Sequence, residues 1–177
     1  MYPSMFRHVN GRKISVKGEF GRPEYYPAPP DNENLLFFIQ SNQNVNTVVY
    51  EANTLLDGRL NLIEPIKVYW HKFTDNGQIK QLNYIQRKLA YGYDFKSIND
   101  DVIQFNMVSY DKITFYLDKI KEGKRTVFTR ISGLLSKLSN IYVYAEDFGL
   151  FPDVKYIELY GHHTQTGEPA YERIYIQ

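Results

Sequence analysis

The chain of 177 residues contains no cysteine, so disulfides, thiolate nucleophiles, iron–sulfur clusters and cysteine-based zinc sites are excluded. It also lacks an excess of either charge, since 21 basic residues face 20 acidic ones. A formal net charge of +1 gives no overall field to attract nucleic acid or anionic membranes. The longest apolar run, Leu35 to Ile39, is far too short for a membrane-spanning helix. Met1 to Asn10 lacks the apolar core of a signal peptide, which leaves the compartment open and allows an exported mature form.

Signatures of the common enzyme classes are absent as well. The sequence has no Gly-rich phosphate loop, no Gly-x-Ser-x-Gly nucleophile elbow and no His-Glu-x-x-His helix. No cofactor is therefore expected, and the balance is against an enzyme.

Aromatic residues, by contrast, are abundant: 16 tyrosines, 11 phenylalanines and one tryptophan. Hydrophobic residues make up 43% of the chain, enough to form a core. Tyrosine suits a half-buried pleated surface, where its ring packs and its hydroxyl reaches water. The composition thus favours a soluble protein built from strands.

Strand-like segments recur from Leu35 to the C-terminus. Leu35 to Gln40 is a short buried run, and Ile66 to Phe73 places Ile66, Val68 and Trp70 on one face before the turn residues Asp75-Asn76-Gly77. The period becomes helical only over Leu82 to Tyr91, and Gly92 follows as a stop. We predict a mainly β fold, an antiparallel sandwich or partly open barrel of about eight strands with one short helix at 82–91.

The first 34 residues differ from the rest. Arg22 to Pro30 contains four prolines, and proline cannot donate to a strand ladder, so this stretch cannot be a central strand. We expect residues 1–34 to form an extended N-terminal arm and residues 35–177 to form a single domain.

The predicted helix is one candidate site. If it covers an opening of the sheet, then Gln86, Arg87 and Tyr91, with Trp70 on the neighbouring strand, line a ligand pocket. The simpler interpretation is a helix that only completes the core while Arg87 and Lys88 stay in water.

The loop that follows the strand at 154–160 is a second candidate. His162 and His163 are adjacent, with Glu158 before them and Glu168 after, and imidazole and carboxylate groups are metal ligands and acid–base pairs. Both histidines reach one ion only if the chain turns there, because neighbours on a strand point to opposite faces. A structural loop is the simpler interpretation.

A third possibility is single-stranded nucleic-acid binding. Lys112 to Lys137 holds seven basic residues and two acidic ones, with Phe115, Tyr116 and Phe128 interleaved. Lys121, Lys124, Arg125 and Arg130 could then contact a backbone while the rings stack on bases. Ordinary core packing explains the rings as well, and nucleic acid is the less favoured partner.

Four blocks of the chain are familiar together: Leu35 to Asn53, Ile66 to Gly77, Leu82 to Tyr93 and Val154 to Ile174. In this order they resemble an uncharacterised bacterial family known only as a domain of unknown function. The likeness covers about four fifths of the chain and is most specific at the helix block and at Ile157 to Gly161. It implies no reaction, cofactor or catalytic residue.

The function that fits these observations is a non-catalytic binding or interaction module for a small ligand or a protein partner. The alternatives are a metal-assisted or acid–base enzyme that uses the 158–168 loop, and a single-strand nucleic-acid binder.

Overall fold

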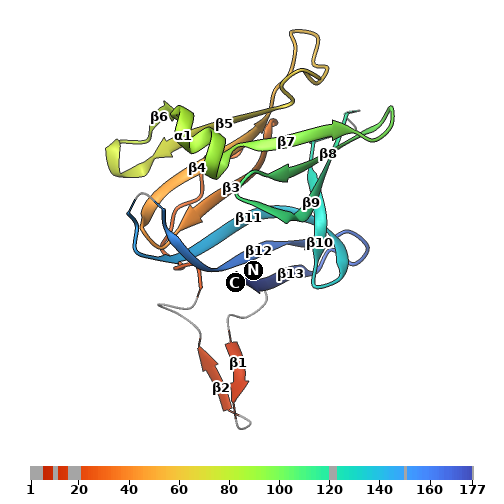
Figure 1. Cartoon of the computed structure of the whole chain (residues 1–177). Coiled ribbons are helices and arrows are strands. Elements are labelled where there is room, and N and C mark those ends of the chain that lie inside the picture. The colour runs from red at the N-terminus through yellow and green to blue at the C-terminus, as the bar shows by residue number, and fades with distance from the viewer. Residues whose placement is uncertain (1–5, 10–11, 16–20, 120–122, 150, 177) are drawn as a thin grey trace.

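A computed structural model describes residues 6–9, 12–15, 21–119, 123–149 and 151–176. One sheet of eleven strands, β3 to β13, curls into a half-barrel (Figure 1). The strands are β3 (Leu35–Ser41), β4 (Asn44–Ala52), β5 (Ile66–Lys72), β6 (Gln78–Gln81), β7 (Tyr93–Ser97), β8 (Val102–Met107), β9 (Tyr110–Asp118), β10 (Val127–Ile131), β11 (Leu134–Glu146), β12 (Asp153–His163) and β13 (Pro169–Tyr175). A separate hairpin pairs β1 (Phe6–Val9) with β2 (Arg12–Ser15).

The helical elements are short. They are a 3-10 turn, η1 (Phe73–Asp75), one α-helical turn, α1 (Tyr84–Gln86), and a π-helical turn, η2 (Arg87–Tyr91). The predicted mainly β fold with one short helical segment is confirmed, in the partly open barrel form. Among the described residues, no helix is long and apolar enough to cross a membrane.

β11 organises the sheet. Along one edge its first residues pair with β10, and residues Asn140 to Val143 then pair with β3. β12 pairs along the other edge. The β3–β11 pairing is parallel, so the sheet is mixed, while the other pairings among the described strands agree with the mainly antiparallel arrangement that the sequence indicated. Because β3 and β10 share one edge of β11, the walls β3–β6 and β7–β10 diverge from it and leave an interior between them.

An irregularity in β11 marks the point where it changes partner. The register with β12 shifts between Leu138 and Asn140, opposite Gly161. A Cβ atom on Gly161 would lie 2.0 Å from the carbonyl oxygen of Lys137. The bulge therefore requires glycine at position 161, since any side chain would collide with the backbone of β11.

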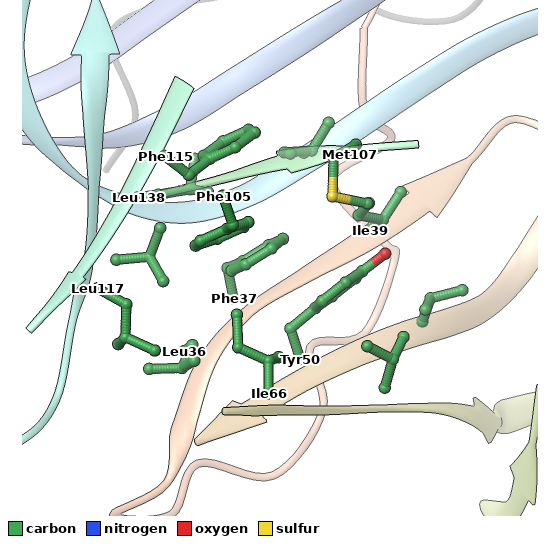
Figure 2. Packing of buried hydrophobic residues seen from close by; sticks show 14 of the residues in the cluster. Leu36, Phe37, Ile39, Tyr50, Ile66, Phe105, Met107, Phe115, Leu117 and Leu138 are labelled. Carbon is green, nitrogen blue, oxygen red and sulfur yellow. The ribbon is translucent and has the colours of Figure 1, made fainter. Parts of the chain in front are cut away.

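The inner face of the half-barrel holds the main core. Stacked aromatic rings fill its centre: the Phe37 and Tyr50 centroids lie 4.3 Å apart, and those of Phe105 and Phe115 lie 5.1 Å apart. Figure 2 shows these rings projecting toward one another from the two walls. The Phe37 and Phe115 centroids, 6.1 Å apart, join the walls.

Inner-facing residues change character along each strand. On β5, Ile66 and Val68 are buried, Trp70 is half-buried, and the row ends at the half-exposed Lys72. On β8 the buried Ile103, Phe105 and Met107 lead to an exposed serine in the turn that follows. The half-barrel is therefore solid at one end and open at the other.

The outer face carries a smaller core of tyrosines that includes Tyr26 and Tyr142, whose ring centroids are 6.3 Å apart. The chain around Tyr26 lies over this face. The Tyr26 hydroxyl donates to the carbonyl of Ser41 at 3.0 Å, and the Arg22 Nε donates to the Gln40 Oε1 at 2.7 Å. The Gln40 amide in turn donates to the carbonyl of Pro27 at 2.6 Å. That residues 1–34 form an arm distinct from the domain stays a prediction.

Four elements depart from the sequence-based expectation. β6 and β7 were not predicted, since nearly all their residues are exposed and show no buried face. Residues 134–140 form the start of β11 although Leu134, Leu135 and Leu138 have helical spacing. The helix begins at Tyr84 and takes π geometry from Arg87, and its residue Ile85 is 55% exposed although the helical spacing placed it on the apolar stripe.

Candidate functional site

The open end of the half-barrel contains a cavity of about 590 Å³, a size typical of small-molecule sites. Its walls come from β3, β5, β8, β9, β11, β12 and η2, so residues far apart in the sequence meet there. Most are apolar or aromatic, and the largest apolar ones are Ile39, Trp70, Leu89, Tyr91, Met107, Tyr110, Ile113, Phe115, Ile141, Phe148, Phe151 and Ile157.

Polar residues line the cavity near its opening. The hairpin of β3 and β4 contributes Ser41 at the end of β3, Gln43 in the turn, and Asn44 and Asn46 on β4. Gln43 and Asn44 are exposed, whereas the buried residues Ile141 and Phe115 belong to the wall. The cavity thus has apolar walls and polar neutral groups at the turn by its opening.

The wall nearest the helix is fixed by a hydrogen-bonded cap. The Asn83 side chain accepts from the backbone N–H of Gln86 at 2.8 Å, and the Gln86 Oε1 accepts from the backbone N–H of Asn83 at 3.0 Å. The same Gln86 oxygen accepts from the indole Nε1 of Trp70 at 3.2 Å. Gln86 therefore joins the start of the helix to β5 and sets the orientation of the indole in the cavity wall.

The π turn places Tyr91 against that indole. The two ring centroids are 5.3 Å apart in an edge-to-face arrangement. The carbonyl of Tyr91 accepts from the buried hydroxyl of Tyr50 at 2.7 Å. The turn ends at Gly92, where a Cβ atom would lie 1.9 Å from the carbonyl oxygen of Arg87. Glycine at position 92 thus allows the chain to leave the π turn and enter β7.

The buried phenols of the inner face act as donors and packing groups. Burial raises the pKa of Tyr50 well above its usual value and also raises the pKa of Tyr91. Burial raises the pKa of Tyr93 to about 12, and its hydroxyl donates to the carbonyl of Ile66 at 2.8 Å. None of these hydroxyls is activated as a base near neutral pH.

The four residues expected to bind a ligand therefore divide in the structure. Trp70, Gln86 and Tyr91 lie together in the cavity wall. Arg87 is exposed and its guanidinium lies 4.0 Å from the Glu64 carboxylate, away from the described lining residues. Ligand binding by any of them stays a prediction.

The expected metal ligands lie at β12 rather than in a turned loop. Both His162 and His163 belong to the strand, so their side chains point to opposite faces. His162 is exposed, and the His163 Nδ1 lies 2.9 Å from the Ser136 Oγ. Within the described ranges, no three His, Asp or Glu residues are grouped so as to hold a metal ion. Metal binding by these residues stays an untested expectation.

Glu158 is completely buried on the outer face and belongs to a polar cluster. Its carboxylate accepts from the hydroxyls of Tyr160, at 3.0 Å, and Tyr171, and from the Arg173 guanidinium at 3.2 Å. Burial, reinforced by the Glu158 charge, raises the pKa of both phenols. Every oxygen of the carboxylate is thus occupied by a protein donor, an arrangement that stabilises a buried charge.

The basic residues considered for nucleic acid do not share one surface role. Lys124 pairs with Asp31, and Arg130 is exposed and donates to the carbonyl of Gly133 at 3.3 Å. Arg125 is buried and donates to the carbonyl of Gly58 at 3.1 Å. Lys121 lies outside the described residues.

Sequence reasoning missed several lining residues. Phe148, Phe151 and Pro152 come from the connection between β11 and β12, and Phe151 is 74% exposed. Two phenylalanines in a connection that also holds Gly149 and Pro152 are an observable signal, because large apolar side chains exposed on a loop are typical of a binding surface.

Comparison with known proteins gives one match. Neither a curated protein nor a solved structure matched the chain. Residues 37–173 match the model of a family described as Domain of unknown function (DUF4833), and the expected likeness to an uncharacterised family is thereby confirmed. That match includes all strands from β4 to β12 and the whole helical segment, so the chain belongs to this family.

Proposed function

We propose that the protein is a non-catalytic binding module that holds a small, largely apolar ligand in the cavity of the half-barrel. The observation that carries the proposal is the hollow itself. The inner-facing side chains pack tightly at one end of the half-barrel, and at the other end they leave a cavity of about 590 Å³. The cavity is open, so without a ligand its apolar lining, which includes Trp70, Tyr91 and Met107, stays in contact with water, and covering that surface is favourable.

The construction of the wall supports the same proposal. Gln86 fixes the indole of Trp70, and the capped turn fixes Tyr91, so two aromatic surfaces are set before any ligand arrives. A preformed wall lowers the entropic cost of binding. The polar groups outside the cavity that resemble an acid–base site are occupied with one another, which favours binding over catalysis.

The test uses the neutral apolar fluorophore N-phenyl-1-naphthylamine. Trp70 is the only tryptophan of the chain, so energy transfer from it to the bound fluorophore reports on this cavity. We expect saturable binding, seen as an increase in probe emission with loss of Trp70 emission.

A matched pair of variants locates the probe. Val154→Phe adds bulk to a residue that lines the cavity, and we expect it to weaken probe binding about tenfold or more. Val102→Phe adds the same bulk to a half-buried valine that is not among the described lining residues, and should leave binding unchanged. Failure of the wild-type protein to bind the probe, or equal binding by both folded variants, would overturn the proposal.

A further inference from the structure

The cavity has a single electrostatic feature. Among the described residues that line it, Lys72 alone is charged, and no carboxylate is present. The other polar lining groups are neutral amides and hydroxyls such as those of Asn44, Asn46 and Ser109. The charge of the lining is therefore a lone cation beside a large apolar surface.

The strand and an aromatic ring set the position of Lys72. It is the last inner-facing residue of β5, two positions after Trp70, and so lies between the apolar wall and the open end. Its Nζ lies 4.1 Å from the centre of the Trp70 ring, a cation–π distance. The ammonium is thus held at the same surface that a ligand would contact.

No described carboxylate neutralises this ammonium at close range. The ion pairs within 4.0 Å among the described residues involve other side chains. Burial lowers the pKa of Lys72, the charge of Lys80 lowers it further, and the charge of Asp75 opposes them. A partly desolvated cation interacts strongly with an anion, since the local dielectric is lower than that of water.

We propose that the ligand is an apolar molecule with one carboxylate, whose body lies along Trp70, Tyr91 and Met107 and whose carboxylate pairs with Lys72. The inference rests on the proposed function and adds the chemical class of the ligand to it. Charge complementarity selects the anion: a cationic ligand would meet Lys72 as a like charge with no described carboxylate in the lining to offset it.

The test compares ligands of equal length and different charge. Decanoate, decan-1-ol and decylamine, each below its micelle concentration at pH 7.5, are titrated against the wild-type protein with displacement of N-phenyl-1-naphthylamine as the readout. We expect decanoate to bind about tenfold or more tightly than decan-1-ol, as expected of a hydrogen bond to a charged group, and decylamine to bind most weakly. Naphthalene-2-carboxylate, run in parallel, distinguishes an aromatic body from an alkyl one.

Two lysine variants assign the preference. Lys72→Met replaces the ammonium with an uncharged side chain of similar length and should abolish the advantage of decanoate over decan-1-ol, with both affinities calibrated against the affinity of the same variant for the fluorophore. Lys80→Met removes the neighbouring exposed ammonium of β6, which does not line the cavity, and should keep most of that advantage. Thermal melting verifies that both variants fold.

The outcomes separate the two proposals. If the wild-type protein binds the neutral fluorophore but decanoate no better than decan-1-ol, or if both lysine variants behave alike, the carboxylate inference is wrong and the binding cavity stands. If the neutral fluorophore does not bind, the proposed function itself falls.

Discussion

The two faces of the sheet use the same strands for opposite purposes. The inner face is mainly apolar and is hollow at its open end, where Lys72 is the only charged group among the described lining residues. The outer face carries packed tyrosine rings and a polar cluster, in which the fully buried Glu158 accepts from two phenols and a guanidinium. Alternation along a strand produces both faces, since successive side chains point in opposite directions.

The difference shows which polar groups are available for function. Glu158 is the side chain that a search for reactive residues would select, yet its oxygens already have protein donors. Lys72 attracts no notice in the sequence, yet in the structure it lies beside a cavity with no described ion-pair partner. The two residues differ in whether the charged group is free to bind a ligand.

The largest effect is expected on the outer face. Glu158→Gln keeps the shape of the side chain but leaves Arg173 without its carboxylate, and should lower the free energy of unfolding by about 3 kcal/mol. Urea denaturation followed by circular dichroism measures it. The control Glu146→Gln alters an exposed carboxylate 4.0 Å from Lys155 and should cost under about 0.5 kcal/mol. A loss below about 1 kcal/mol in Glu158→Gln would show that the cluster is not a stabilising unit.

The next largest effect is expected at the bulge where β12 pairs with β11. Gly161→Ala brings a methyl group against the carbonyl of Lys137 at the bulge and should cost about 2 kcal/mol. Gly149→Ala is the control: its Cβ would meet only the Asp147 side chain, at 3.3 Å, and the loss should stay under about 0.5 kcal/mol. Equal unfolding curves for the two variants would mean that the bulge in β11 does not require glycine at position 161.

A smaller effect is expected at the cavity wall. Gln86→Ala removes the acceptor of the Trp70 indole and half of the helix cap, and should cost about 1 kcal/mol. Trp70 emission should change as the indole loses its partner. Gln78→Ala, at an exposed position of β6, should alter neither quantity. Unchanged Trp70 emission in Gln86→Ala would contradict the role given to this hydrogen bond.

The smallest effect is expected at Arg87. Arg87→Ala should change the free energy of unfolding by less than about 0.5 kcal/mol and leave the affinity for N-phenyl-1-naphthylamine unchanged, because Arg87 is exposed and outside the described lining. Tyr91→Ala, four residues later in the same turn, should weaken probe binding about tenfold. If Arg87→Ala weakened probe binding more than Tyr91→Ala, the binding site would lie on the exposed side of the helix and not at the inner wall.

The hydrophobic pattern of the sequence predicted strands that have buried side chains. The strands at 35–40 and 66–73 were expected from an apolar run and from alternation, and each overlaps a strand of the structure. β6 and β7 escaped because edge strands with exposed side chains carry no such pattern. The start of β11 escaped for a related reason, since its bulge interrupts the alternation.

The candidate site was only partly accessible to sequence reasoning. The sequence grouped Gln86, Arg87, Tyr91 and Trp70 as possible ligand-binding residues. All but Arg87 are among the described lining residues, and ligand binding by any of the four stays a prediction. Phe148 and Phe151 could not be placed, because they reach the cavity only after β11 and β12 have paired. The parallel pairing of β3 with β11 joins residues about a hundred positions apart, beyond the range of any local pattern.

That parallel pairing also bears on how the chain is made. β3 begins at Leu35, but its partner Asn140 emerges from the ribosome roughly a hundred residues later. Until then β3 and β4 form the end of an open meander whose β3 edge has unsatisfied backbone groups, the kind of edge that recruits other chains. Contacts of such long range also slow folding. The cavity can therefore form only after β11 has been synthesised, and until then the nascent N-terminal half carries an open strand edge of the kind that favours aggregation.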